Sequence, residues 1–326
     1  MDTRKLQHVG GSTYTVSLPK EWVRAAGLGA GDEIGVHAHD GAVIVQPPES
    51  TTVARATVRG AAGDGLPPER IVDVAYAAGV RELLIRADEL TERERRTAAA
   101  TARRRPGVSV SGEGDDLVVR TLLDAEEISL RQSVRQLSFV ALSASREATA
   151  VVAGEREAVP TDDGGDEQAA RLRAMVDRSL ARGLERFGEV DALGLGRTEL
   201  FELRETARHL AGMADDADRV QRLAAEPDGL PANTEPARAL AAASDDLAEA
   251  AADVVVGDSG IGPLCSAFRA FDTVRDEADP GDDPRERLLF ERVERSAARA
   301  ASLGRVALRR ALRDDELSEP LAADGR

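Results

Sequence analysis

The first 47 residues constrain this chain most, because they encode short strands, one short helix and tight turns in a fixed order. Two alternating stretches, residues 4–9 and 14–18, predict strands on either side of a glycine pair. Pro19 then predicts the start of a short helix, since proline is tolerated in the first helical turn. Gly27 predicts the end of that helix.

A strand pair is expected after this helix. The glycine-rich turn GLGAGDE leads into two stretches in which apolar residues alternate, Ile34 with Val36 and Val43 with Val45. The dipeptide at residues 40–41 is Asp-Gly, which favours a two-residue hairpin turn. A unit of this length buries too little surface to be stable alone. We therefore expect it to need a partner surface.

The order of a strand, the tripeptide LPK, a short helix and a GD turn before a strand pair resembles the AbrB/MazE/SpoVT family of swapped-hairpin DNA-binding domains. The resemblance implies that residues 1–48 of two copies interleave into one β-barrel, as a homodimer that binds DNA. The apolar side chains expected at the shared interface are Leu6, Val9, Val16, Leu18, Ile34 and Val45. The alternative is a small hairpin unit that caps a larger fold.

The expected DNA-binding residues fall into two groups. Cationic side chains suited to phosphates are Arg4, Lys5, Lys20 and Arg24. Polar side chains suited to base edges are Gln7, Ser12, Thr13 and Tyr14. The alternative interpretation is that these are solvated strand and turn residues.

The chain has 326 residues, enough for two or three domains, and a net charge of −16. Residues 1–120 carry 17 acidic and 16 basic side chains, so 42 of the 59 acidic and 27 of the 43 basic residues follow them. The later part is therefore a poor surface for nucleic acid. Only Lys5 and Lys20 are lysines. This composition resembles that of a halophilic archaeon; GC-rich codon bias is the alternative explanation.

The single cysteine, Cys265, excludes an internal disulfide and fits a reducing compartment. No apolar run approaches the length of a membrane-spanning helix, and no secretory segment opens the sequence. We therefore expect a cytoplasmic protein without membrane insertion.

Residues 49–123 alternate strand and helix patterns in the order β-α-β-α-β-β. Proline and glycine bound the first helix, and Thr91 is expected to cap the second. This order predicts a small connecting domain, an α+β sandwich of ferredoxin-like type.

Residues 124–326 have helical periodicity throughout. Three helices are expected within about 124–226, interrupted by PTDDGGD and by GEVDALGLGR at residues 188–197. Three more are expected within about 236–315, which suggests an internal repeat. The long-short-long triplet, repeated twice, resembles the PhoU fold of phosphate-uptake regulators and implies an all-α pair of three-helix bundles.

The third helix of each triplet carries that resemblance. In residues 208–224, Asp215 matches the family's aspartate, but Ala211 and Gly212 replace its Glu-Arg pair. In residues 293–304, Glu294 and its neighbouring arginine match, but Ala298 replaces the aspartate. Some family members bind metal through such carboxylates, so Asp215 and Glu294 are candidate ligands for a divalent or ferric ion. The alternative for the cluster at residues 215–218 is a solvated helix face.

Together these features predict a DNA-binding transcriptional regulator linked to phosphate uptake and homeostasis. No catalytic constellation accompanies the four histidines and one cysteine, so no enzymatic activity is expected. Two alternatives remain. One is a PhoU-type adaptor that does not bind DNA and contacts a phosphate transporter or a signalling kinase. The other is a metal-carboxylate binding protein.

Overall fold

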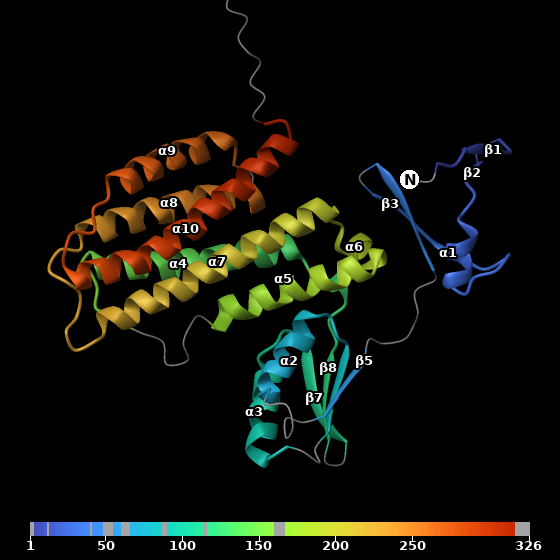
Figure 1. Ribbon diagram of the computed structural model, residues 1–326, viewed down its shortest axis with the longest axis horizontal. Helices are drawn as coiled ribbons and strands as arrows, with labels where there is room; N and C mark the ends of the chain where they lie inside the picture. Colours follow the sequence, from blue (N-terminus) through green and yellow to red (C-terminus); the bar gives the residue numbers. More distant parts are fainter. Residues whose placement is uncertain are drawn as a thin grey trace, which may run out of the picture. The chain divides into compact units, whose positions relative to one another are not determined.

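A computed structural model describes the fold (Figure 1). The residues that it describes are 3–11, 13–39, 41–47, 55–59, 66–86, 90–113, 116–159, 167–257 and 259–316. The chain divides into two compact units, Met1–Val53 and Ala54–Arg326. The expected boundary between residues 48 and 49 lies outside the described residues.

The first unit consists of two hairpins with one short helix between them. Its elements are β1 (Gln7–Val9), β2 (Thr13–Thr15), α1 (Lys20–Ala25), β3 (Gly35–His39) and β4 (Ala42–Gln46). β1 pairs antiparallel with β2, and β3 pairs antiparallel with β4, as two separate two-stranded sheets. The predicted order of elements is confirmed, although the first two strands are shorter than predicted.

The second unit begins with an α+β part. Its elements are β5 (Arg55–Arg59), α2 (Pro68–Ala77), β6 (Glu82–Arg86), α3 (Glu92–Arg103), β7 (Val108–Glu113) and β8 (Asp116–Thr121). Thr91 caps α3 as predicted: its hydroxyl accepts from the Glu94 backbone N–H, and the Glu94 carboxylate accepts from the Thr91 N–H. The two helices and the sheet share one apolar core that includes Val72, Ile85 and Ala98.

The prediction of a ferredoxin-like sheet is wrong. The strand order is β5-β6-β8-β7, with β5 and β6 adjacent and parallel, whereas a ferredoxin-like fold separates the strands of each βαβ unit. Burial explains this order. Three successive residues of β8, Leu117, Val118 and Val119, are buried, so β8 takes the central position beside β6. β7 exposes Ser109 and Ser111 and forms the edge.

The remainder of the second unit is helical. A short 3-10 turn, η2 (Ala125–Glu127), precedes α4 (Leu130–Val152), α5 (Glu167–Glu185), α6 (Phe187–Leu193), α7 (Arg197–Ala224), α8 (Glu235–Val256), α9 (Ile261–Glu277) and α10 (Pro284–Arg313). The predicted helices are confirmed within a few residues. The interruption predicted at residues 188–197 is wrong, because α6 occupies most of it. This helix buries Val190 completely, and Gly194 ends it.

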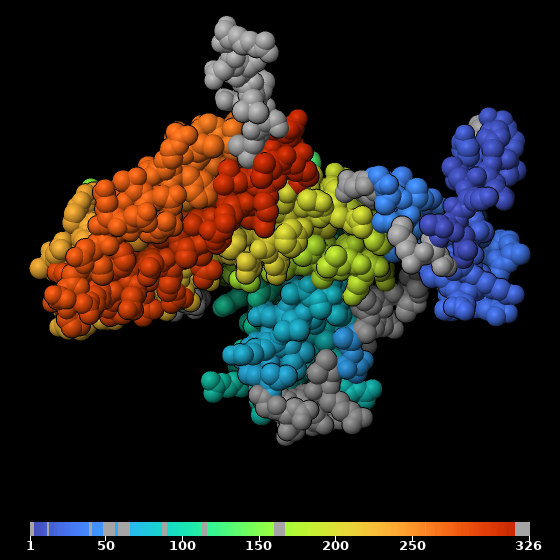
Figure 2. All heavy atoms as spheres, turned by 45° about the horizontal axis from the view of Figure 1, so that its top comes forward, coloured from blue at the N-terminus to red at the C-terminus, as the bar shows by residue number. Residues whose placement is uncertain are grey.

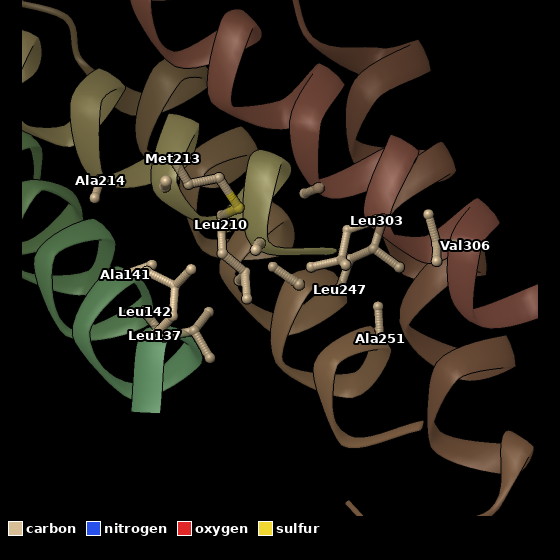
Figure 3. Packing of buried hydrophobic residues seen from close by; sticks show 14 of the residues in the cluster. Leu137, Ala141, Leu142, Leu210, Met213, Ala214, Leu247, Ala251, Leu303 and Val306 are labelled. Atoms are coloured by element: carbon tan, nitrogen blue, oxygen red, sulfur yellow. The ribbon is translucent and has the colours of Figure 1, made fainter. Parts of the chain in front are cut away.

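Four helices surround one apolar interior, to which α4, α7, α8 and α10 each contribute. Figure 3 shows Leu137, Leu210, Leu247 and Leu303 directed inward from these four helices. α5 packs on α4 and α7, whereas α9 packs mainly on α8. Both helical triplets therefore share a single core, and many of its residues are alanines that allow close helix approach.

Two buried arginines of α5 fasten the α+β part to the helices. Arg178 Nη1 donates to the carbonyl oxygens of Tyr76 and Val80, each at 3.0 Å, and its guanidinium lies 5.0 Å from the Tyr76 ring centre. Arg182 Nη1 donates to the Gly79 carbonyl oxygen at 3.4 Å, and the same guanidinium pairs with Glu189 of α6. In Figure 2 the cyan surface of α2 lies against the yellow-green surface of α5. The two parts of the second unit are thus held together by specific polar contacts.

Candidate functional site

The β1–β2 hairpin carries three of the predicted base-reading residues. Gln7 pairs with Thr15, His8 with Tyr14, and Val9 with Thr13. Because side chains alternate along a strand, Gln7 and Thr13 share one face of the hairpin and Tyr14 lies on the other. There the Tyr14 and His8 rings meet edge to face, with centres 5.1 Å apart. The structure therefore brings Gln7 and Thr13 together and separates Tyr14 from them.

The predicted cations lie before the hairpin and on α1. Lys20 is the first residue of α1 and Arg24 lies in its last turn, four residues later and therefore on the same helix face. Arg4, Lys5, Lys20 and Arg24 are all exposed. Ser12 lies outside the described residues. These side chains are accessible to a phosphate backbone, as the DNA-binding hypothesis requires.

A compact turn joins α1 to the second hairpin. The Asp32 carboxylate accepts a 2.8 Å hydrogen bond from the Gly29 backbone N–H, and the Asp32 N–H donates in return to the Gly29 carbonyl at 3.3 Å. This reciprocal pair fixes the loop without help from the rest of the chain. The GD dipeptide that carries the family resemblance thus has a local structural role.

The first unit has no apolar core of its own among its described residues. None of residues 3–11, 13–38 and 41–47 is buried. The exposed large apolar side chains are Leu6, Val9, Tyr14, Val16, Ile34, Val36 and Val43, the last with 68% of its surface accessible. Leu18 and Val45 are half-buried. So many exposed large apolar side chains in so short a unit indicate an interaction surface, so we expect the unit to need a partner.

Comparison with known proteins supports the same conclusion. Residues 7–52 match the family model described as antidote-toxin recognition MazE, bacterial antitoxin. No curated protein and no solved structure matches the chain. The first unit is therefore similar to domains of the MazE/AbrB type, a class that binds DNA and usually dimerises. Among the described residues, no helix is sufficiently long and apolar to cross a membrane.

The two predicted metal ligands, Asp215 and Glu294, differ in burial. Asp215 is half-buried, and this burial raises the pKa of its carboxyl group. Glu294 is exposed. In the described part of the chain, no three His, Cys, Asp or Glu side chains come together as a metal-binding group. Metal binding at Asp215 or Glu294 stays a prediction, which elemental analysis of the purified protein would test.

The solvated-face interpretation of the acidic cluster is wrong for two of its members, since Asp216 and Asp218 are buried. Asp216, with 1% of its surface accessible, contacts Arg299 at 2.6 Å, Arg219 at 2.5 Å and Arg295 at 3.4 Å. Three guanidinium groups thus neutralise one buried carboxylate. Gly212 permits this approach, because a Cβ there would meet the Arg299 guanidinium. Asp218 pairs with Arg222.

A further buried carboxylate, Asp245, was not predicted from the sequence. Only 4% of its surface is accessible, and α4 supplies two hydroxyl donors, Ser145 at 2.5 Å and Thr149 at 2.8 Å. Burial raises the pKa of Asp245 to about 6. The available signal was an aspartate three and seven residues before Ala248 and Ala252, on a face of α8 that these buried alanines share.

Proposed function

We propose that this protein is a DNA-binding transcriptional regulator that acts as a homodimer through its first unit. The observation that carries the proposal is an exposed apolar surface on the two hairpins of a MazE-like domain. A second copy can cover that surface and complete a shared β-barrel. In the dimer, each copy contributes one set of cations and one β1–β2 hairpin to the duplex.

Within this proposal, phosphate contacts and base contacts come from different side chains. Arg4, Lys5, Lys20 and Arg24 are exposed cations that would contact phosphates. Gln7 and Thr13 share a hairpin face and would reach base edges together. Tyr14 would contact the duplex only from the opposite face of the hairpin. Specificity then rests mainly on Gln7 and Thr13.

The second unit would carry the regulatory input. We assign it a role in sensing or relaying phosphate status, with a phosphate transporter or signalling protein as a candidate partner. This assignment rests on the PhoU resemblance and on the two successive groups of helices, α4–α7 and α8–α10. The proposal includes no catalytic activity and places the protein in the cytoplasm.

An antitoxin is the second candidate function, favoured by the description of the matching family. An antitoxin of this type would use the same DNA-binding unit and would recognise a toxin protein. A toxin protein that copurifies with the chain in stoichiometric amount would distinguish an antitoxin from a regulator that acts on DNA alone.

The DNA-binding proposal is tested by removing two cations from the full chain. In the double variant Arg4→Ala/Lys5→Ala, binding to every duplex should weaken, because phosphate contacts carry no sequence information. The slope of log K against log salt should flatten by roughly 0.9 for each phosphate that the variant no longer neutralises. Fluorescence anisotropy with promoter duplexes from phosphate-transport operons, across a KCl series, measures both quantities.

A matched control removes two exposed arginines from the helical region, Arg269→Ala/Arg309→Ala, and should leave both quantities unchanged. If the Arg4/Lys5 double variant binds as well as the parent at every salt concentration, the DNA-binding proposal fails. The adaptor hypothesis would then take its place.

A further inference from the structure

A groove of about 640 Å³ runs between α4 and α8. It has the size of a small-molecule site. Phe139 of α4 lines it with 68% of its surface accessible, beside the more buried Leu142. No role assigned above uses this groove. Its lining shares no residue with the predicted DNA-binding set.

The two sides of the groove carry opposite charge. Arg135, Arg146 and Arg156 line it from α4 and the turn that follows, where Glu147 is the one acidic residue. Glu249 and Asp253 line it from α8, whose C-terminal carbonyl groups add partial negative charge on that side. A purely anionic ligand would meet three carboxylates, and a purely cationic ligand three guanidinium groups. The groove thus favours a ligand that carries both charges.

Two of these charges remain available to a ligand. Arg146 is paired with Glu249 at 2.6 Å, and Arg135 donates to the Val256 carbonyl oxygen at the end of α8. The side chains of Arg156 and Asp253 form no ion pair or hydrogen bond within the described part of the chain. A ligand with one cationic and one anionic group could therefore bind both without displacing an existing ion pair.

The separation of these two charges sets the length of the ligand. The links from Arg146 to Glu249 and from Arg135 to Val256 show that α8 runs antiparallel to α4, which places Asp253 opposite the stretch around Phe139. Arg156 follows α4, which ends at Val152, and lines the same groove as Ala150. At 1.5 Å of rise per residue, Phe139 and Ala150 are about 16 Å apart along α4. An extended peptide of four to five residues covers roughly that distance.

We propose that this groove binds a short peptide with free termini, about four residues long, with its ammonium group at Asp253 and its carboxylate at Arg156. The apolar surface of Phe139 and Leu142 accepts the side chain near the peptide's N-terminus. This site is independent of DNA binding by the first unit.

The test uses the full chain and the peptide Ala-Phe-Ala-Ala, with binding measured by isothermal titration calorimetry. Three matched probes each remove one feature: the N-acetylated peptide, the C-terminal amide and the dipeptide Ala-Phe. Each should bind at least tenfold more weakly than the tetrapeptide. The first two lose a hydrogen-bonded charge, and the dipeptide cannot reach both charges.

Charge variants identify which end binds where. Asp253→Asn should weaken binding of the tetrapeptide and its amide at least tenfold, with little effect on the N-acetylated form. Arg156→Gln should weaken the tetrapeptide and the N-acetylated form, with little effect on the amide. Exposed control changes on α9, Arg269→Gln and Glu277→Gln, should alter nothing. Absence of saturable tetrapeptide binding at millimolar concentration, or binding that neither groove variant weakens, would overturn the proposal.

Discussion

Thr149 Oγ1 donates a 2.8 Å hydrogen bond to Oδ2 of Asp245, and this contact joins the first helical triplet to the second. Ser145, one turn earlier on α4, donates to the other carboxylate oxygen at 2.5 Å. Within the described residues the buried carboxylate has no cationic partner at ion-pair distance. Its protonation state therefore matters to the stability of the contact between α4 and α8.

The first prediction concerns pH. Burial raises the pKa of Asp245 from 3.8 to about 6, against the smaller opposing effects of the two hydroxyl groups and Arg146. Between those pH values the folded state binds one proton that the unfolded state lacks, so stability should fall as pH rises from about 4 to about 6. The fall attributable to this group is at most about 3 kcal/mol.

Asp245→Asn should abolish this component and exceed the parent in stability above pH 6. Urea unfolding at a series of pH values measures the difference between the two proteins. Asp246→Asn, at the neighbouring exposed position, is the matched control; the Asp246 charge makes only a small contribution to the raised pKa of Asp245, so this variant should change the parent's pH dependence only slightly. A parent and an Asp245→Asn variant with parallel pH profiles would contradict the prediction.

The second prediction concerns Gly212 of α7. Glycine to alanine inside a helix ordinarily stabilises a protein by about 0.5–1 kcal/mol. Here the new Cβ would displace the Arg299 guanidinium from the buried Asp216 carboxylate, and losing a hydrogen bond to a charged group costs about 1.5–3 kcal/mol. Gly212→Ala should therefore destabilise the protein by about 1–2 kcal/mol, measured by chemical unfolding.

Gly262→Ala supplies the control, because a Cβ at that position of α9 meets open space. It should leave stability unchanged or raise it. In an Arg299→Ala background the cost of Gly212→Ala should disappear, since the displaced group is already absent. A Gly212→Ala variant as stable as the parent would contradict the proposed role of the glycine.

The third prediction concerns the junction between α2 and α5. Arg178→Ala removes the guanidinium donor from the Tyr76 and Val80 carbonyl groups, of which Tyr76 keeps the Gly79 N–H, and should destabilise the second unit by about 1–3 kcal/mol. Burial lowers the pKa of Arg178 to about 10, so the guanidinium stays charged at neutral pH. Hydrogen exchange should accelerate at the backbone N–H groups of residues 78–80, which follow α2.

Arg178→Lys should recover only part of this loss, because an ammonium group cannot reproduce the planar fork of a guanidinium. Arg171→Ala, an exposed change on the same helix, should have no effect on exchange near α2. If Arg178→Ala, Arg178→Lys and Arg171→Ala all show the same exchange rates at residues 78–80, apolar packing alone holds the α+β part against the helices.

The fourth prediction concerns the first unit. Val16 is an exposed apolar residue between β2 and α1, and in a homodimer it would be covered by the second copy. Val16→Asp would bury an unpaired charge there, so light scattering should show a shift from dimer to monomer. Val74→Asp, at an exposed apolar position of α2, should leave the oligomeric state unchanged. A Val16→Asp variant that stays dimeric would exclude this surface as the interface.

The sequence by itself determined the order of the elements and most of their ends. The capping box at Thr91 and Glu94, the proline before α1 and the alternating hairpins involve residues only a few positions apart. Their hydrogen bonds and backbone angles depend on local chemistry, so local patterns predict them. The MazE-like unit was predictable for the same reason, since its turns and short helix form from neighbouring residues.

Only the tertiary structure decided which faces meet. β8 pairs with β6 because Leu117, Val118 and Val119 require burial, and α6 forms because Val190 packs into the helical core. The burial of Asp216 and Asp245 depends on arginine and hydroxyl groups more than 80 residues distant in sequence. Burial and charge pairing arise from contacts between distant segments, and these contacts leave no local signature in the chain.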